Sequence, residues 1–69
     1  MCEVGAVYEH YKGKEYTIVA IARHSENDDF YCVYRALYEP YTTFVRPLCM
    51  FFDNVTVHGV TVPRFKKVV

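Results

Sequence analysis

Short hydrophobic runs alternate along the chain with polar segments that contain turn-forming residues. The two longest runs, Tyr16 to Arg23 and Phe30 to Tyr38, lack Gly and Pro and are rich in β-branched and aromatic residues. Such residues favour a pleated, half-buried strand. The polar HSENDD segment between the runs favours a hairpin loop, because its side chains readily bond their own backbone. We therefore expect two central strands, with Tyr16, Ile18 and Ala20 on one face of the first.

Shorter elements are predicted on both sides of this pair. Gly13 can adopt a positive φ, which is typical of a tight turn. Pro47 ends a strand and suits the first position of a helix, where its missing N–H is harmless, so one or two helical turns are expected within Pro47 to Asp53. Two further strands are predicted at Gly5 to Tyr11 and at Thr43 to Arg46. Val55 to Val57, a turn at His58-Gly59 and Val60 to Val69 together give the final strand or strand pair.

Short strands with tight turns and one late helical turn indicate an all-β fold. We predict a single domain over residues 1–69, a small antiparallel SH3-like barrel of about five strands with one short helical turn. An OB-fold is the second choice, because it is usually longer and carries its helix earlier. The expected core residues are Val7, Ile18, Ala20, Val33, Leu37, Val45, Leu48, Phe51 and Val62.

Composition excludes several classes of function. The formal net charge is 0, and general binding to a phosphate backbone needs a basic stripe, so nucleic acid is not an expected partner. No apolar run approaches the roughly 20 residues of a membrane span. Hydrophobic residues make up 52% of a chain with little interior, so we expect a homo-oligomer. Cys2, Cys32 and Cys49 form no CxxC pair and no signal peptide is evident, which favours reduced thiols and a cytoplasmic location.

Every arginine lies inside or at the end of an apolar run, whereas the lysines lie in turns or near the C-terminus. Arg35 shares a strand face with Val33 and Leu37, because side chains two positions apart point the same way. Burying an unpaired guanidinium is costly. We therefore expect Arg35 to have a partner, which is a carboxylate, a group of carbonyls or an anionic ligand.

Two interpretations of the arginines remain open. The planar guanidinium suits phosphate and carboxylate, and Tyr34, Tyr38, Phe44 and Phe65 can stack on a planar group. The first hypothesis is a non-enzymatic module, without a cofactor, that holds a phosphate-bearing or nucleotide-like small molecule. Its predicted ligand-binding residues are Arg23, His24, Tyr34, Arg35, Arg46 and Arg64. In the alternative, the arginines pair with Glu26, Asp53 and strand-end carbonyls, and the protein is an SH3-like interaction adaptor whose aromatic groove consists of Tyr8, Tyr11, Tyr31 and Tyr41.

Catalysis and metal binding find little support. The segment His24-Ser25-Glu26 has poor geometry for a nucleophile and its base, because adjacent strand residues point to opposite faces. We interpret it as a brace for the hairpin loop and predict no catalytic residue. The three histidines and three cysteines lack the spacing of a zinc site, so no metal is predicted.

Five motifs distributed along the chain resemble one family, in that family's order. They are Gly5…Tyr8-Glu9-His10-Tyr11-Lys12-Gly13, Ala22-Arg23-His24-Ser25-Glu26, Val33-Tyr34-Arg35-Ala36-Leu37-Tyr38, Val45-Arg46-Pro47-Leu48…Met50-Phe51 and Val62-Pro63-Arg64-Phe65. The family consists of short bacterial and phage proteins and is filed as a domain of unknown function. The resemblance implies a compact, mostly β domain that often stands alone. Its phage context extends the first hypothesis to a phage protein that sequesters a host signalling nucleotide.

Overall fold

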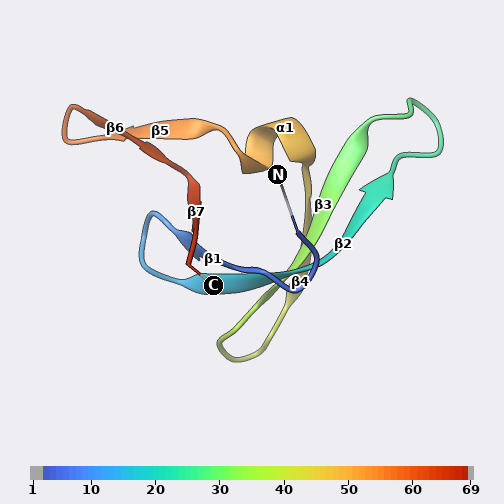
Figure 1. The fold of residues 1–69 in the computed structure, drawn as a ribbon, viewed down its shortest axis with the longest axis horizontal. Coiled ribbons are helices and arrows are strands. Elements are labelled where there is room, and N and C mark those ends of the chain that lie inside the picture. The colour runs from blue at the N-terminus through green and yellow to red at the C-terminus, as the bar shows by residue number, and fades with distance from the viewer. Residues whose placement is uncertain (1–2, 69) are drawn as a thin grey trace.

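Residues 3–68 form seven strands and one helical turn in a computed structural model of the protein (Figure 1). The predicted thiol Cys2 and the predicted strand end at Val69 lie outside the described residues. The elements in chain order are β1 (Val7–His10), β2 (Glu15–Arg23), β3 (Phe30–Ala36), β4 (Thr43–Pro47), α1 (Leu48–Phe51), β5 (Asn54–Val57), β6 (Val60–Pro63) and β7 (Phe65–Lys67).

The strands form one antiparallel five-stranded sheet and one separate hairpin. The sheet has the order β4-β3-β2-β1-β7, and β5 pairs with β6. The hairpin turns at His58-Gly59, where φ is 51° and 79°. Positive φ at both central residues is the geometry of a type I′ turn, whose twist matches that of antiparallel strands. The turn therefore lies where the sequence predicts it.

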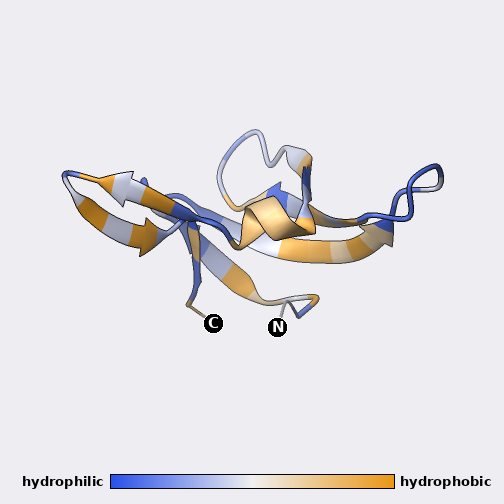
Figure 2. Cartoon of the chain, turned by 90° about the horizontal axis from the view of Figure 1, so that it is seen from above, coloured by the Kyte–Doolittle hydropathy of each residue, from blue (hydrophilic) through white to orange (hydrophobic). Residues whose placement is uncertain are grey.

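The hydrophobic core covers one face of the five-stranded sheet, which we call the inner face. Phe51 from α1 stacks on Phe65 from β7, with ring centroids 4.1 Å apart and ring planes at 4°. Figure 2 shows α1 as a hydrophobic turn, whereas the β2–β3 loop is hydrophilic. The helical turn therefore acts as a plug on the inner face. The buried residues are Ala6, Tyr8, Ile18, Cys32, Tyr34, Ala36, Phe51 and Phe65.

Part of the predicted core lies elsewhere. Ile18 and Phe51 are buried as predicted, but Leu37 is 40% exposed and Val45 is 63% exposed. Both prediction errors have one cause. Strand β3 carries apolar side chains on both faces, and the face with Tyr34 turns inward, so the opposite face stays accessible to water. The other predicted core residues are only partly buried, namely Val7, Ala20, Val33, Leu48 and Val62.

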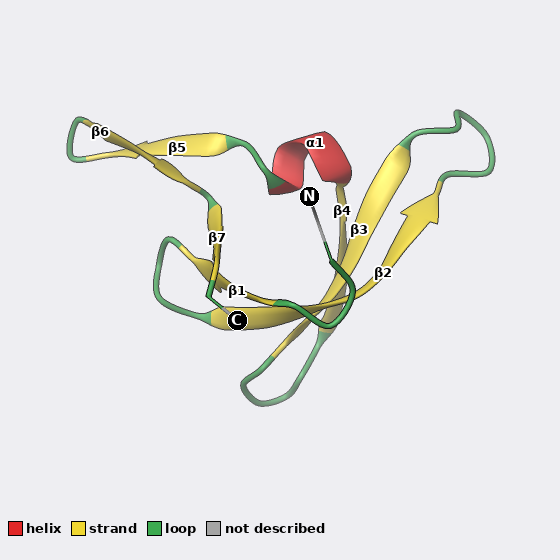
Figure 3. Cartoon of the chain, viewed as in Figure 1, coloured by secondary structure: helices red, strands yellow, loops and turns green. Residues whose placement is uncertain are grey.

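The five-stranded sheet is curved but does not close into a barrel. Its edges are β4 and β7, which do not pair with each other within residues 3–68. After β4 the chain enters α1, which packs against β3 and β4 and lies over the gap between the edges (Figure 3). We call this gap the seam. The all-β class, the antiparallel pairing and the single short helix are confirmed, whereas the predicted barrel closure is replaced by a helical plug.

Candidate functional site

The structure separates two of the predicted arginines from the rest. Arg23 lies at the end of β2, with its Nε 3.9 Å from Asp28 Oδ1 and its guanidinium over the ring of Phe30. Arg35 is exposed on the outer face of β3, where its side chain has no hydrogen bond or ion pair to any residue between 3 and 68. The expectation that Arg35 is buried is wrong, so its charge stays in water and burial no longer requires a partner.

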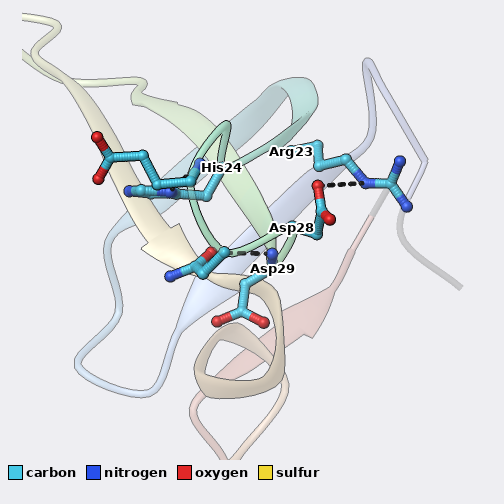
Figure 4. A network of polar contacts seen from close by, with 6 residues as sticks. Arg23, His24, Asp28 and Asp29 are labelled. Atoms are coloured by element: carbon cyan, nitrogen blue, oxygen red, sulfur yellow. Dashed lines mark hydrogen bonds and ion pairs between the residues drawn. The ribbon is translucent and has the colours of Figure 1, made fainter.

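His24 belongs to the loop that joins β2 to β3. Its Nδ1 accepts a hydrogen bond from the Glu26 N–H at 3.1 Å, and the Asp29 N–H donates to Asn27 Oδ1 at 3.0 Å (Figure 4). Such local side-chain bonds replace the backbone bonds that a strand would make. His24 therefore braces the loop, and the structure places it with Arg23 rather than with the other predicted site residues.

Two other predicted residues lie together on the inner face. In the β3–β4 register Phe44 pairs with Tyr34 and Arg46 pairs with Cys32, and paired residues project from the same face of a sheet. The Phe44 ring stacks on Tyr34, with centroids 5.6 Å apart and planes at 28°. Arg46 is partly buried, and its side chain makes no hydrogen bond or ion pair with another described residue. Its guanidinium donors therefore remain available to a ligand.

Arg64 reaches the seam from the other edge of the sheet. It separates β6 from β7, and its backbone N–H donates to the Asp53 carbonyl at 3.0 Å. Its carbonyl accepts the Tyr11 N–H at 2.9 Å. The side chain forms a two-pronged ion pair, with Nε 2.6 Å from Asp53 Oδ1 and Nη2 3.3 Å from Oδ2. The structural alternative is therefore realised for Arg64, which pairs with the predicted Asp53.

The charges of Arg46 and Arg64 act on the same three groups. Burial is the largest cause that lowers the pKa of His10, and the charges of Arg64, Lys12 and Arg46 lower it further. The hydrogen bond from Arg64 lowers the pKa of Asp53, and both arginine charges add to that effect. Burial raises the pKa of the Tyr34 hydroxyl, against the pull of both arginines. We call this group the seam cluster; it comprises His10, Tyr34, Arg46, Asp53 and Arg64.

The seam cluster contains one residue, His10, that is not among the ligand-binding residues predicted from the sequence. His10 is partly buried at the end of β1, and its ring centroid lies 5.0 Å from that of Phe65. Its Nδ1 accepts the Lys12 N–H at 3.2 Å, which leaves the proton of the neutral ring on Nε2. The only signal in the sequence is a histidine beside a glycine turn. The effect of the Arg46 charge on His10 joins residues far apart in the sequence, and local patterns do not encode it.

Two cavities lie beside the predicted residues rather than among them. One has a volume of about 440 Å³ and lies between the β2–β3 loop and α1, where it is lined by Asp29, Phe30, Pro47, Leu48, Cys49 and Phe52. The other, of about 310 Å³, is lined by Glu9, His10, Tyr11, Gly13, Val62, Pro63 and Lys66. The second cavity shares His10 with the seam cluster, so space for a ligand borders that cluster.

The tyrosine groove of the adaptor hypothesis does not form as predicted. Tyr8 is 4% exposed and belongs to the core, while Tyr11 and Tyr41 are exposed at 38% and 54%. No cluster of three or more metal-ligating side chains occurs within residues 3–68. None of the helices formed by these residues is long and apolar enough to cross a membrane.

Comparisons with known proteins place the chain in a family. A search of curated proteins found no match. A crystal structure of a family member from Bordetella bronchiseptica is 32% identical and superposes with a TM-score of 0.83, over 96% of this chain and 87% of that one. The model of the family described as "Protein of unknown function (DUF1653)" matches residues 6–67. The resemblance drawn from the motifs is therefore confirmed, and the chain belongs to the DUF1653 family.

Proposed function

We propose that the protein is a non-enzymatic binding module that holds a small phosphate-bearing anion at the seam cluster. The observation that carries this proposal is the charge of the cluster. Two permanent cations, Arg46 and Arg64, approach one carboxylate, Asp53, which Arg64 already engages. Arg46 has no partner among the described residues, so the cluster carries one uncompensated guanidinium. Such a group is suited to two parallel hydrogen bonds with a phosphate.

The surroundings of Arg46 favour a ligand with a planar group. Phe44 lies two positions away on the same strand face, and its ring stacks on Tyr34 while remaining 40% exposed. An exposed aromatic ring beside a cation can stack on a nucleobase, an interaction worth about 1–3 kcal/mol per base. The combination supports a nucleotide-like ligand, with its phosphate at Arg46 and its base against Phe44.

The fold gives each arginine a different role in this proposal. Arg64 is fixed by Asp53 at the bend between β6 and β7, so it contributes positive charge from a defined position. Arg46 provides the donors that contact the ligand. Arg23 and Arg35, which the sequence groups with them, lie at the far end of β2 and on the outer face. They are therefore left out of the proposed site and provide matched controls.

A thermal-shift screen tests the proposal. The probes are inorganic phosphate, pyrophosphate, nucleoside monophosphates and triphosphates, and cyclic nucleotides. A ligand at 100 times its dissociation constant stabilises the folded state by about 2.7 kcal/mol, which raises the midpoint of a domain this small by roughly 10–20 °C. We expect at least one nucleotide to shift the wild type and the Arg35→Gln control equally, and to shift Arg46→Gln much less. If no anion shifts the wild type, or if Arg46→Gln responds as fully as Arg35→Gln, the proposal is wrong.

A further inference from the structure

The 440 Å³ cavity is a second site that the seam cluster does not explain. It lies between two regions of the chain. The end of the β2–β3 loop contributes Asp29 and the start of β3 contributes Phe30, while the region around α1 contributes Pro47, Leu48, Cys49 and Phe52. It shares no residue with the seam cluster. Its volume falls within the range of small-ligand pockets, about 300–1,000 Å³.

The cavity is mostly apolar, and its two aromatic lining residues remain partly exposed. Phe30 is 50% exposed and Phe52 is 43% exposed, although both are large aromatic residues. Exposed aromatic side chains that line one cavity are typical of an interaction site. Because pockets for small molecules enclose most of their ligand, a cavity whose two large aromatic residues remain this exposed favours a peptide as the occupant.

One carboxylate on the cavity wall has no partner in the described structure. Asp28, its neighbour, faces the Arg23 guanidinium, whereas the Asp29 carboxylate points away from that ion pair (Figure 4). Asp29 uses only its backbone in the loop, where its N–H donates to Asn27 and its carbonyl accepts the His24 N–H. A carboxylate at the edge of an apolar cavity favours a cation there, because the apolar wall weakens screening by water.

We propose that this cavity receives a peptide segment of a partner protein in which a basic side chain lies next to a large apolar one. The apolar side chain fills the space between Phe30 and Phe52, and the basic side chain pairs with Asp29. This recognition is opposite in charge to that of the seam cluster, so the two sites take different ligands. Arg23 does not reverse the local charge, because it is paired with Asp28 and lies over the ring of Phe30.

Selection from a displayed library of random twelve-residue peptides, with wild-type protein as the target, tests this proposal. The expected enriched peptides carry Lys or Arg beside Leu, Phe, Trp or Met. One enriched peptide is then synthesised and its affinity measured. Asp29→Asn should weaken binding roughly threefold to tenfold, in line with a partly desolvated ion pair. The matched control is Glu26→Gln, which should change the affinity less than twofold. Glu26 is an exposed carboxylate of the same loop that does not line the cavity.

Cys49 supplies a second readout at the same cavity. Its thiol is free, exposed and part of the lining, whereas Cys32 is 0% exposed. The bound peptide should slow the alkylation of Cys49. The rate is measured by mass spectrometry of the proteolytic fragment that contains Cys49. Failure to enrich basic-apolar peptides, equal affinity for Asp29→Asn and wild type, or unchanged alkylation of Cys49 would each overturn the proposal. None of these results tests ligand binding at the seam cluster, because the experiment contains no nucleotide.

Discussion

Arg64 and Asp53 are joined both through their side chains and through their backbones. The Arg64 guanidinium donates from Nε and Nη2 to the two oxygens of the Asp53 carboxylate, at 2.6 and 3.3 Å, and the Arg64 N–H donates to the Asp53 carbonyl at 3.0 Å. The bond ties the start of β7 to the segment that follows α1. It therefore holds α1 in place over the seam, where β4 and β7 do not pair with each other within residues 3–68.

Asp53→Asn should lower the stability of the fold and change how stability depends on acid. The hydrogen bond from Arg64 holds the pKa of Asp53 below its ordinary value near 4. A lowered pKa means that Asp53 stabilises the folded state above its unfolded pKa and loses that contribution as pH falls through the folded value. Urea denaturation at neutral pH and near pH 3 should show a smaller acid loss in Asp53→Asn than in wild type. Equal losses of stability in the wild type and in Asp53→Asn would show that the ion pair does not contribute to the acid dependence. The control is Asp29→Asn, which should lose as much stability in acid as the wild type.

His10 should titrate below its usual range in the folded protein. Burial is the main cause of its lowered pKa, and the charges of Arg64, Lys12 and Arg46 add to it. The unfolded chain then binds more protons than the folded one just below pH 6.5, so this residue makes stability fall as the solution is acidified through that range. NMR titration of the His10 ring measures the pKa directly. Arg46→Gln should raise the pKa of His10, whereas Arg35→Gln should leave it unchanged. An equal pKa in the wild type and both variants would show that the charge of Arg46 does not act on His10.

Phe51→Ala should destabilise the fold far more than Leu37→Ala. Phe51 is 0% exposed and stacks on Phe65, so its removal leaves a cavity under the plug. Such a change typically costs about 3–5 kcal/mol. Leu37 is 40% exposed, and substitutions at exposed positions usually change stability by less than about 0.5 kcal/mol. Chemical denaturation compares the two, and Phe51→Leu provides a milder variant if Phe51→Ala does not fold. A large loss in Leu37→Ala would place the core on the opposite face of β3.

The outer face favours the predicted homo-oligomer. Three aliphatic side chains of the sheet region are exposed, namely Val19 at 44%, Leu37 at 40% and Val45 at 63%. Of these, Val45 lies on the edge strand β4. Edge strands with apolar side chains readily pair with another chain. We expect sedimentation at micromolar concentration to show a dimer or larger species, and Val45→Lys to shift it toward the 8.1 kDa monomer. Val60→Lys, at a similarly exposed site on β6, is the control. A monomeric wild type would contradict the expectation.

Local sequence patterns predict where the strands and turns lie, but they do not predict which face of a strand is buried. The runs, the HSENDD loop and the His58-Gly59 turn lie where the sequence places them, because strand and turn preferences are local. Strand β3, in contrast, is apolar on both faces, so alternation alone does not decide whether Tyr34 or Arg35 turns inward. The irregular register between Ile18 and Ala20 adds a second error, because it moves Ala20 to the face opposite Ile18.

The sequence predicts only part of the seam cluster. Arg46 and Arg64 are named because they lie in apolar runs, and Tyr34 because its ring can stack on a planar group. The pairing of Arg64 with Asp53 is expected as an alternative and is found. His10 was missed as a member of the cluster, and Arg23 pairs with Asp28 rather than with Glu26. These relations depend on how far each loop reaches and on how the sheet curves. Neither property is encoded in the type of the residue itself.

NMR titration of the wild-type backbone with adenosine monophosphate tests the central claim, that the seam cluster binds a nucleotide-like anion, most directly. The account predicts that saturating shifts concentrate at His10, Tyr34, Arg46 and Arg64, that they persist in Arg35→Gln, and that they are lost in Arg46→Gln. The lowered pKa of His10 should also rise when the phosphate is bound, because a nearby anion favours the protonated ring. Spectra that remain unchanged at millimolar nucleotide, or shifts that appear only at residues outside the seam cluster, would contradict it.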